Sequence, residues 1–272
     1  MNNQPLVSLI TVCFNAAEVL ESTLKSALNQ TFQNFELVII DGGSTDQTLA
    51  IANQFKDKIG YIVSEKDKGI YDAMNKGVKA AKGKWIYFLN AGDAFYSANV
   101  LSDIFEKEIP DVVQLIYGRI ETKNEPTGIN YTAGKPVNIA DFYAGYPICH
   151  QATFSKKQLF DTLGYFNTKY KLAADTEWFY RVFKKHENQC LFVPNTIAYY
   201  DIQGTTYHKR MAGYREYLDF GRTHFPLVIC IKNYLYYPLL WMKVKAIRFF
   251  TDTFVFKIYR QFKFRNQQAA KK

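Results

Sequence analysis

The sequence predicts an α/β fold, in which a mostly parallel central sheet carries helices on both faces and a helical extension follows. Three observations support this prediction. Apolar runs alternate with amphipathic helical stretches over the first 118 residues, several runs end in loops rich in Gly, Asp and Asn, and the charge balance changes near residue 226. Runs that are apolar throughout are typical of parallel strands covered by helices, and their alternation with helices predicts right-handed crossovers.

The charge distribution divides the chain into a neutral domain and a basic tail. Residues 226–272 contain ten Lys or Arg and one acid, whereas the first 225 residues contain 24 bases and 24 acids. The net charge of +9 therefore belongs to the tail, which argues against a nucleic-acid partner for the whole protein. We expect one domain over 1–225, with halves 1–118 and 119–225, and a separate tail over 226–272.

Cysteine spacing and hydropathy limit the cellular context. The four cysteines are far apart and form no C-x-x-C pair, which argues against a zinc site or a disulfide framework and fits a reducing cytoplasm. The sequence has no stretch of about 20 uncharged apolar residues, the length that a membrane-spanning helix needs. No Lys or Arg precedes the apolar run that starts at Leu6, so we assign this run to a strand and not to a signal peptide.

Strand and helix patterns alternate in the first half. The predicted strands are 6–13, 35–40, 61–64 and 85–89, and the predicted helices are 18–29, 47–55 and 70–81. The loop Asp41-Gly42-Gly43-Ser44-Thr45-Asp46 follows the second strand, and Ser44 with Gln47 forms a capping-box pattern for the next helix. A strand, a glycine loop and a capped helix form the layout of a nucleotide site, although a tight βα connection has the same pattern.

The fourth predicted strand ends in the loop Asn90-Ala91-Gly92-Asp93. Ligands of open α/β sheets bind beyond the carboxyl ends of the strands, and a carboxylate there can hold a hard divalent cation against a phosphate. We therefore predict Asp93 as a metal ligand. The alternative is a simple turn, because Asn, Gly and Asp are common turn residues.

The second half is predicted to contain the helix 98–108, the strand 112–117, loops to 147, the strand 147–154, the helix 172–185 and the strand 191–200. His150 lies in the strand 147–154, where a lone histidine is either a buried core residue or a ligand contact. Asp175 opens the following helix. Its carboxylate is either a helix cap or a general base that projects into a cleft, with Glu177 as the next candidate for the base.

Four motifs then carry a resemblance to a known family. They are Thr11-Val12-Cys13-Phe14-Asn15, Asp41-Gly42-Gly43-Ser44-Thr45-Asp46, Gly69-Ile70-Tyr71-Asp72-Ala73-Met74-Asn75-Lys76-Gly77 and Phe88-Leu89-Asn90-Ala91-Gly92-Asp93. Their order and spacing over residues 5–205 resemble the family 2 glycosyltransferases. The resemblance implies a Rossmann-like GT-A fold, a nucleotide-sugar donor, a divalent cation (Mg²⁺ or Mn²⁺) and inversion at the anomeric carbon.

The resemblance also implies roles for individual residues. Asp41 would contact the nucleobase, which favours a UDP-sugar, Asp93 would be the last acid of a D-x-D-type metal motif, and Asp175 would be the catalytic base. Asn90-Ala91-Gly92 replaces the earlier acids of that metal motif, so the donor diphosphate would complete the coordination. The implied donor-binding residues are Thr11, Cys13, Asn15, Asp41, Ser44, Asp72, Asn75, Asn90, Gly92, His150 and Gln151.

Two further features belong to the end of the chain. Gly204-Thr205-Thr206 resembles the family's loop over the donor diphosphate, and His208, Lys209 and Arg210 follow it. The tail interleaves eleven aromatic residues with its ten bases, and Pro238 interrupts it, so we predict two short amphipathic helices. Aromatic and basic residues anchor helices in anionic headgroup layers. Packing on the domain, or on a second subunit in a homo-oligomer, is the alternative.

The sequence thus predicts a bacterial inverting glycosyltransferase that moves a sugar from a nucleotide-diphosphate sugar to a hydroxyl of a glycan or lipid-linked acceptor. We expect it in the cytoplasm, peripheral on the inner face of the cell membrane, in the biosynthesis of a surface polysaccharide or exopolysaccharide. A non-catalytic nucleotide-binding or scaffold module of the same fold is the alternative, and a nucleotidyltransferase is a weaker one.

Overall fold

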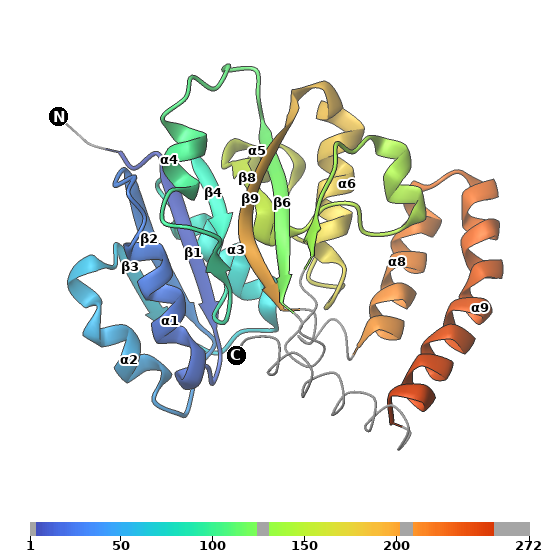
Figure 1. Cartoon of the computed structure of the whole chain (residues 1–272), viewed down its shortest axis with the longest axis horizontal. Helices are drawn as coiled ribbons and strands as arrows, with labels where there is room; N and C mark the ends of the chain where they lie inside the picture. Colours follow the sequence, from blue (N-terminus) through green and yellow to red (C-terminus); the bar gives the residue numbers. More distant parts are fainter. Residues whose placement is uncertain (1–3, 124–130, 202–208, 253–272) are drawn as a thin grey trace, which may run out of the picture.

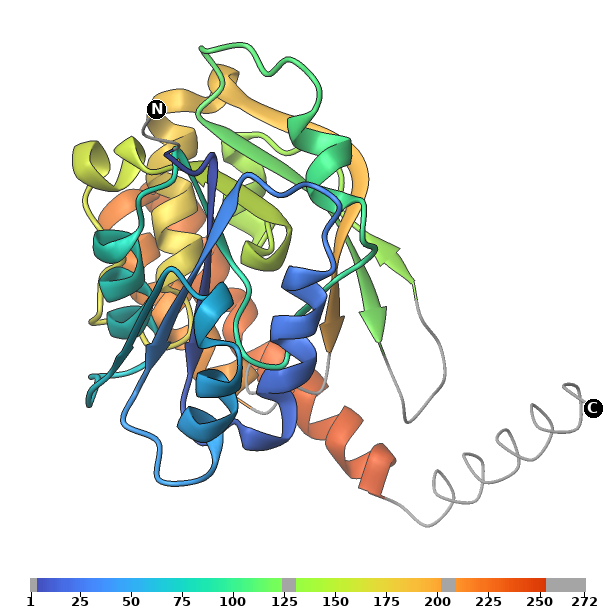
Figure 2. The ribbon, with the colours of Figure 1, turned by 90° about the vertical axis from the view of Figure 1, so that its left-hand side faces the viewer.

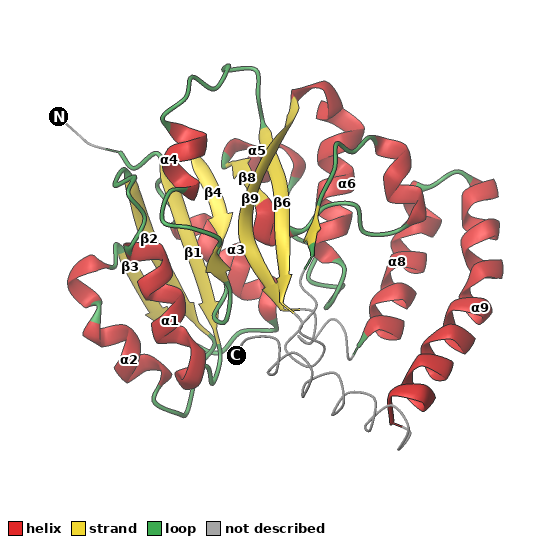
Figure 3. Ribbon diagram, in the orientation of Figure 1, coloured by secondary structure: helices red, strands yellow, loops and turns green. Residues whose placement is uncertain are grey.

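The computed structural model describes residues 4–123, 131–201 and 209–252. The described residues form one nine-stranded sheet. Figures 1 and 3 show it flanked by helices, with two long helices, α8 and α9, beyond one end of the sheet. The strand order is β3-β2-β1-β4-β8-β6-β9-β5, and the short strand β7 pairs with β6.

The strands are β1 (Val7–Cys13), β2 (Phe35–Asp41), β3 (Tyr61–Ser64), β4 (Trp85–Phe88), β5 (Ala94–Phe95), β6 (Leu115–Lys123), β7 (Thr132–Ala133), β8 (Thr153–Lys156) and β9 (Cys190–Asp201). The α-helices are α1 (Ala17–Leu28), α2 (Thr48–Gln54), α3 (Ile70–Ala80), α4 (Val100–Phe105), α5 (Gln158–Leu163), α6 (Ala174–His186), α8 (Arg210–His224) and α9 (Leu227–Asp252). The 3₁₀ turns are η1 (Lys56–Lys58), η2 (Ile139–Ala144), η3 (His150–Ala152) and η4 (Glu187–Gln189).

The sheet has a parallel half and a mixed half. β3, β2, β1 and β4 pair in parallel, so the loops that follow β1, β2 and β4 meet at one edge, as the alternating pattern predicted. β8 pairs antiparallel with β4 and β6, while β6 and β9 pair in parallel. The sheet is therefore continuous from the first half of the chain into the second.

Alternate side chains of the strands face the two helical layers. Ile10, Val12 and Ile40 join the core beneath α3, α5 and α6. Cys13 and Ile39 pack with α1 and α2 on the other face, where α4 covers Tyr87. Figure 1 shows these layers in front of and behind the sheet. Because successive side chains of a strand point to opposite faces, runs that are apolar throughout fit a sheet covered on both sides.

Several predicted boundaries differ from the structure. The predicted strand 147–154 is the 3₁₀ turn η3 followed by β8, so His150 and Gln151 lie in a turn that precedes the strand. β6 extends beyond its predicted end to Lys123, because pairing with β9 and β7 continues the strand through Gly118 and the polar residues after it. The helix predicted at 98–108 is shortened to α4.

The predicted capping box at the start of α2 is wrong. The N-cap residue of α2 is Gln47, and its side chain makes no cap hydrogen bond. The Ser44 hydroxyl instead donates to Asp41, and the Thr48 amide is bound by the Asp46 carboxylate at 3.0 Å. Ser44 thus binds Asp41 and does not cap the helix, because a buried carboxylate without hydrogen-bond donors costs more free energy than an uncapped, exposed helix end.

The two short helices predicted for the tail are also wrong over the described residues. α9 is one helix that contains Pro238. Its inner face packs on α8 and η2: Leu240 is buried in the main core, and the Asn233 amide donates to the Tyr143 carbonyl at 3.2 Å. Packing of the helix on both sides of Pro238 compensates for the loss of the backbone hydrogen bond that proline cannot donate.

No helix within the described part of the chain is long and apolar enough to cross a bilayer. The outer face of α9 is nevertheless apolar, with Leu227, Val228, Leu235 and Leu239 more than half exposed. Figure 2 shows the far end of α9 reaching away from the body of the molecule. The tail therefore combines packing, which was the alternative in the sequence analysis, with a large uncovered apolar face.

Candidate active site

The carboxylate of Asp41 organises the loop that follows β2. It accepts hydrogen bonds from the amides of Gly43 and Ser44 at 3.2 and 3.0 Å, from the Ser64 hydroxyl at 2.6 Å and from the Ser44 hydroxyl. Burial opposes the charged form of Asp41, but the hydrogen bonds from Ser44, Ser64 and Gly43 outweigh this effect and lower its pKa. The structure thus places Asp41 at the predicted nucleotide site, in a role that shapes the loop.

Asn15 joins the β1 loop to the β2 loop. Its backbone has a φ of +47°, which Asn tolerates better than most residues. Its side-chain oxygen accepts from the Thr45 amide at 2.9 Å, and its own amide donates to the Ser44 hydroxyl at 2.8 Å. Asn15, Asp41 and Ser44 therefore form one cluster.

Four other residues predicted to bind the donor have different surroundings. Thr11 lies inside β1 and is 1% exposed, and Cys13 is buried with its thiol 3.7 Å from Asp41 Oδ1. The amide of Asn75 makes two hydrogen bonds with the backbone of Phe166, at 2.9 and 3.0 Å. Asp72 accepts from the Lys68 amide at 3.0 Å. Cys13 thus touches the loop cluster through Asp41, whereas Thr11, Asn75 and Asp72 lie outside it.

A second cluster lies at the end of β4 and joins Asp93 to Asp175. Gln151 Nε2 is 3.5 Å from Asp93 Oδ1, Asn90 Nδ2 is 3.2 Å from His150 Nε2, and His150 Nδ1 is 3.1 Å from Asp175 Oδ2. The predicted residues Asn90, Asp93, His150, Gln151 and Asp175 are thus brought together. Burial opposes the imidazolium, but the hydrogen bond and charge of Asp175, together with the charge of Asp93, raise the pKa of His150.

Asp175 lies in the first turn of α6 but is not its cap. The N-cap residue is Ala173, which has no capping side chain. Asp175 Oδ1 instead accepts from the Tyr71 hydroxyl at 3.0 Å and from the Thr176 amide at 2.8 Å. Burial and the adjacent charge of Asp175 raise the pKa of Tyr71, so its hydroxyl remains a donor. Sequence analysis missed the role of Tyr71, although this residue lies within one of the four quoted motifs.

The segment before α6 is held by a second residue that sequence analysis missed. The Glu216 carboxylate, which comes from α8, accepts from the amides of Lys171, Leu172 and Ala173 at 2.8–3.1 Å. A carboxylate at the start of a helix also interacts favourably with the helix dipole. Glu216 thus takes the place of the missing side-chain cap and fixes the turn that carries Asp175.

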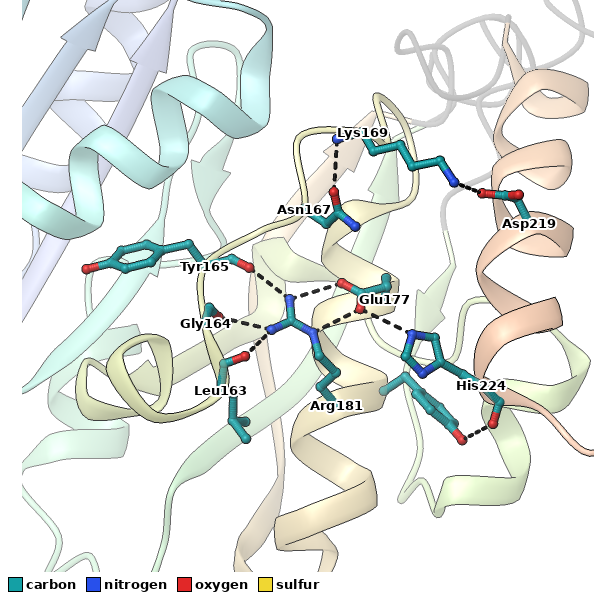
Figure 4. Close-up of polar contacts among 10 residues, drawn as sticks. Leu163, Gly164, Tyr165, Asn167, Lys169, Glu177, Arg181, Asp219 and His224 are labelled. Atoms are coloured by element: carbon teal, nitrogen blue, oxygen red, sulfur yellow. Dashed lines mark hydrogen bonds and ion pairs between the residues drawn. The ribbon is translucent and has the colours of Figure 1, made fainter.

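Glu177, the second candidate for the base, is structural. Figure 4 shows its carboxylate between Arg181 and His224. Arg181 donates to Glu177 at 3.0 Å and to the carbonyls of Gly164 and Tyr165 at 3.1 and 2.8 Å. Glu177 is buried and bound to a guanidinium, which argues against its role as a reserve base.

The surroundings of Asp93 fit a single-carboxylate cation site. Burial raises the pKa of Asp93 to about 6, an effect that His150 and Gln151 only partly offset. Asn90 belongs to the same loop as Asp93, and its side-chain oxygen is buried without a hydrogen-bond partner. Thr23 Oγ1 accepts from the Gly92 amide and donates to the Asp93 carbonyl, both at 2.9 Å, and so fixes the loop. The described residues contain no group of three or more metal-ligating side chains, so a bound cation would need further ligands.

A cleft of about 1020 Å³ opens beside Asp175. Its walls come from the start of α3, the β6–β7 hairpin, the segment 146–151, the segment 171–176 and α8. His150 and Gln151 lie where this cleft meets the Asp93 cluster. The predicted loop Gly204-Thr205-Thr206 and His208 lie outside the described residues, whereas Lys209 lines the cleft.

Comparison with known proteins identifies the family. The model of the glycosyl transferase family 2 matches residues 8–192. The chain is 36% identical over 204 residues to a PGL/p-HBAD biosynthesis glycosyltransferase of Mycobacterium bovis, covering 72% of this chain and 77% of that one. It is also 29% identical over 192 residues to an uncharacterized glycosyltransferase of Rickettsia prowazekii, covering 66% of this chain and 59% of that one.

Solved structures show the fold. TarS 1–349 of S. aureus in complex with UDP-GlcNAc superposes with a TM-score of 0.63 at 18% identity, covering 79% of this chain and 66% of that one. The mannosyltransferase PcManGT of Pyrobaculum calidifontis in complex with GDP-Man and Mn²⁺ gives a TM-score of 0.65 at 16% identity, covering 89% and 74%. These matches confirm the GT-A fold, and with the family match they show that this chain is a glycosyltransferase of family 2.

Proposed function

We propose that the protein transfers a sugar, with inversion, from a nucleotide-diphosphate sugar to a hydroxyl of a lipid-linked or glycan acceptor, with Asp175 as the general base. The observation that supports this most directly is the position of Asp175, on the wall of the cleft and 3.1 Å from the histidine that also reaches the Asp93 cluster. A base between a donor site and an acceptor cleft is the arrangement that single displacement requires.

The contacts of Asp175 suit it to this role. An ionised carboxylate offers about four lone-pair positions. Tyr71, Thr176 and His150 occupy three of them. The remaining position can accept the acceptor hydroxyl, whose oxygen attacks the anomeric carbon as its proton passes to Asp175. The bond from that carbon to the diphosphate oxygen breaks, and its electron pair leaves with the diphosphate.

The donor would lie over the loop cluster at the ends of β1, β2 and β4. The amides of the Asp41 loop and Asn15 would approach the nucleotide, and Asp93 would hold Mg²⁺ or Mn²⁺ against the diphosphate. A divalent cation there stabilises negative charge on the leaving group. TarS is described with UDP-GlcNAc and PcManGT with GDP-Man and Mn²⁺, so the two neighbours do not separate a UDP-sugar from a GDP-sugar. The family resemblance at Asp41 favours a UDP-sugar.

The test separates binding from chemistry. Nucleotide-sugars are first screened for thermal stabilisation and for hydrolysis with Mn²⁺ present, since a donor that binds the folded state raises its stability. Asp175→Asn should keep the fold and donor affinity while turnover falls by about 10²-fold or more. Asp93→Ala should weaken donor binding and the response to Mn²⁺.

Two controls accompany these variants. Asp161→Asn changes an exposed carboxylate of α5 outside the cleft and should leave turnover unchanged. Glu177→Gln should lower the melting temperature but retain turnover per folded molecule. Normal turnover in Asp175→Asn would refute its assignment as the base. Donor binding without hydrolysis or transfer by the wild type would instead favour the non-catalytic alternative.

We also propose that the protein lies on the inner, anionic face of the cell membrane and acts in surface-polysaccharide or glycolipid synthesis. The outer face of α9 supports this proposal, because exposed Leu235, Leu239 and Met242 lie beside Lys243 and Lys245. Apolar residues flanked by bases are typical of helices that lie in the plane of the headgroups.

A further inference from the structure

The chemical character of the cleft beside Asp175 bears on the acceptor. Ile70, Tyr131 and Tyr146 all line this cleft, and they are 44%, 54% and 47% exposed. Single exposed apolar side chains are ordinary, but three in one cleft form an apolar surface. The lining also includes Tyr117, Ile120, Ile148 and Leu172.

The described polar side chains of the cleft are largely occupied within the protein. Glu216 binds the amides of residues 171–173, and Lys171 Nζ donates to the Lys68 carbonyl at 2.9 Å. Lys135 pairs with Asp141 at 3.0 Å. A glycan chain in water is surrounded by hydrogen bonds, and burying its hydroxyls against groups that are already paired costs free energy. The described lining thus favours an apolar ligand.

We infer that the acceptor carries an apolar aryl or alkyl group next to its accepting hydroxyl, and that this group lies against Ile70, Tyr131 and Tyr146. The inference rests on the proposed function, because Asp175 defines where the hydroxyl must lie. Asp175 is part of the cleft wall, so an acceptor whose hydroxyl reaches Asp175 would place its neighbouring group in the cleft. The size of the cleft matches sites that take drug-sized molecules.

The experiment compares ligands that differ only in the apolar group. Methyl β-D-glucoside and phenyl β-D-glucoside are titrated into the full chain saturated with UDP and Mn²⁺, and binding is followed by calorimetry. Phenyl glucoside should bind at least tenfold more tightly than methyl glucoside, the gain expected from burying one aromatic ring. Equal affinity for the two glucosides would overturn the inference.

Variants then locate the site of binding. The double variant Ile70→Thr, Tyr131→Ser removes two half-exposed apolar side chains and should weaken phenyl glucoside binding roughly tenfold, with UDP affinity unchanged. Tyr61→Ser is the matched control, because Tyr61 is 42% exposed on β3 and does not line the cleft. Phenyl glucoside binding that survives the double variant would also overturn the inference. Melting temperatures check that each variant is folded.

The inference and the proposed function fail in different ways. Asp175→Asn should lower transfer by about 10²-fold or more yet keep phenyl glucoside binding, because the apolar wall is intact. If Asp175→Asn transferred sugar normally while phenyl glucoside still required Ile70 and Tyr131, the base assignment would fail and the apolar cleft would stand. If donor turnover required Asp175 but methyl and phenyl glucosides bound equally, only the acceptor inference would be wrong.

Discussion

At the scale of single residues, buried and half-buried carboxylates divide the work of the site. Asp41 shapes the loop after β2, Asp93 contacts Gln151, Asp175 faces the cleft, and Glu177 and Glu216 fix the backbone around it. Each carboxylate has a different set of donors, and these sets decide its role. A carboxylate saturated by backbone amides or a guanidinium stabilises structure, whereas one with a remaining lone pair toward a cleft can act on a ligand.

The lowered pKa of Asp41 predicts a pH-dependent stability. Asp41 binds its proton more tightly in the unfolded state, where its pKa is about 3.8, than in the folded state. The ionised carboxylate therefore stabilises the folded protein fully at pH values above 3.8. This stabilisation is lost as the pH falls through the lower pKa of the folded state. Asp41→Asn should therefore cost about 2 kcal/mol of unfolding free energy at pH 7, because four donors lose a charged acceptor. The deficit should shrink below pH 4.

Denaturant unfolding of both proteins at pH 7 and at pH 3.5 measures this difference. Ser64→Ala removes a single donor to Asp41 and should show a smaller deficit with the same pH trend. A deficit for Asp41→Asn that is equal at the two pH values would show that the charge of Asp41 does not stabilise the loop.

The sequence could predict which carboxylates lie at the same edge of the sheet, but it could not predict their hydrogen-bond partners. Asp41, Asp93 and Asp175 follow strands or open a helix, so their position at one edge follows from the alternation of elements. Tyr71 and Asp175 are 104 positions apart, and no local pattern encodes their hydrogen bond. The same limit applies to Glu216, which looks like an ordinary exposed acid of a helix until the fold places it under α6.

At the scale of elements, the parallel half was predictable and the second half less so. The strands β1, β2 and β4 lie within a residue or two of their predicted limits because they are largely buried, and β3 has its predicted limits although its two end residues are exposed. β6 was predicted to end at Tyr117, since Gly118-Arg119 breaks the apolar run, but pairing with β9 carries it to Lys123. Tertiary pairing overrides weak local preference in such strands.

Close packing between elements predicts opposite effects for two helical glycines. A Cβ at Gly77 of α3 would meet Ile10 Cγ2 of β1 at 2.4 Å, whereas a Cβ at Gly213 of α8 would have its nearest neighbours at 3.6 Å. Gly77→Ala should destabilise the protein by about 1–3 kcal/mol through overpacking. Gly213→Ala should stabilise it by up to about 1 kcal/mol through helix propensity.

Thermal or denaturant unfolding of the two alanine variants provides the comparison, and each serves as the control for the other. A stabilised Gly77→Ala variant would mean that α3 can move away from β1. Such movement would also displace Tyr71, which comes from the same helix, so donor turnover of this variant is worth measuring alongside its stability.

At the scale of the whole molecule, charge and aromatic content predicted a distinct tail, and α9, the described part of that tail, has two different faces. The inner face packs on the core: the ring of Tyr237 stacks on that of Tyr214, with centroids 5.9 Å apart, and Leu240 is buried. The outer face is apolar and uncovered. Removing the tail after Phe225 would therefore expose core residues, so substitutions on the outer face give a cleaner test than truncation.

The membrane proposal predicts how the full chain partitions onto vesicles. It should cosediment with vesicles that contain phosphatidylserine at low salt, and less with neutral phosphatidylcholine vesicles. Leu235→Glu with Leu239→Glu should reduce binding by more than tenfold, because both side chains are more than half exposed and would enter the headgroup layer. Lys243→Glu with Lys245→Glu should weaken binding to anionic vesicles, at about 1 kcal/mol for each base lost.

Salt and a distant control separate the two contributions. Raising the salt concentration should screen the basic component and leave part of the wild-type protein bound through its apolar face. Val112→Glu, a charge placed on an exposed apolar residue before β6, should bind vesicles like the wild type.

If a second copy of the chain covered the outer face of α9 instead, the wild type would dimerise without lipid, and the Leu235→Glu, Leu239→Glu variant would be monomeric. That result, or a wild-type chain that stays in the supernatant with anionic vesicles at low salt, would refute the membrane proposal.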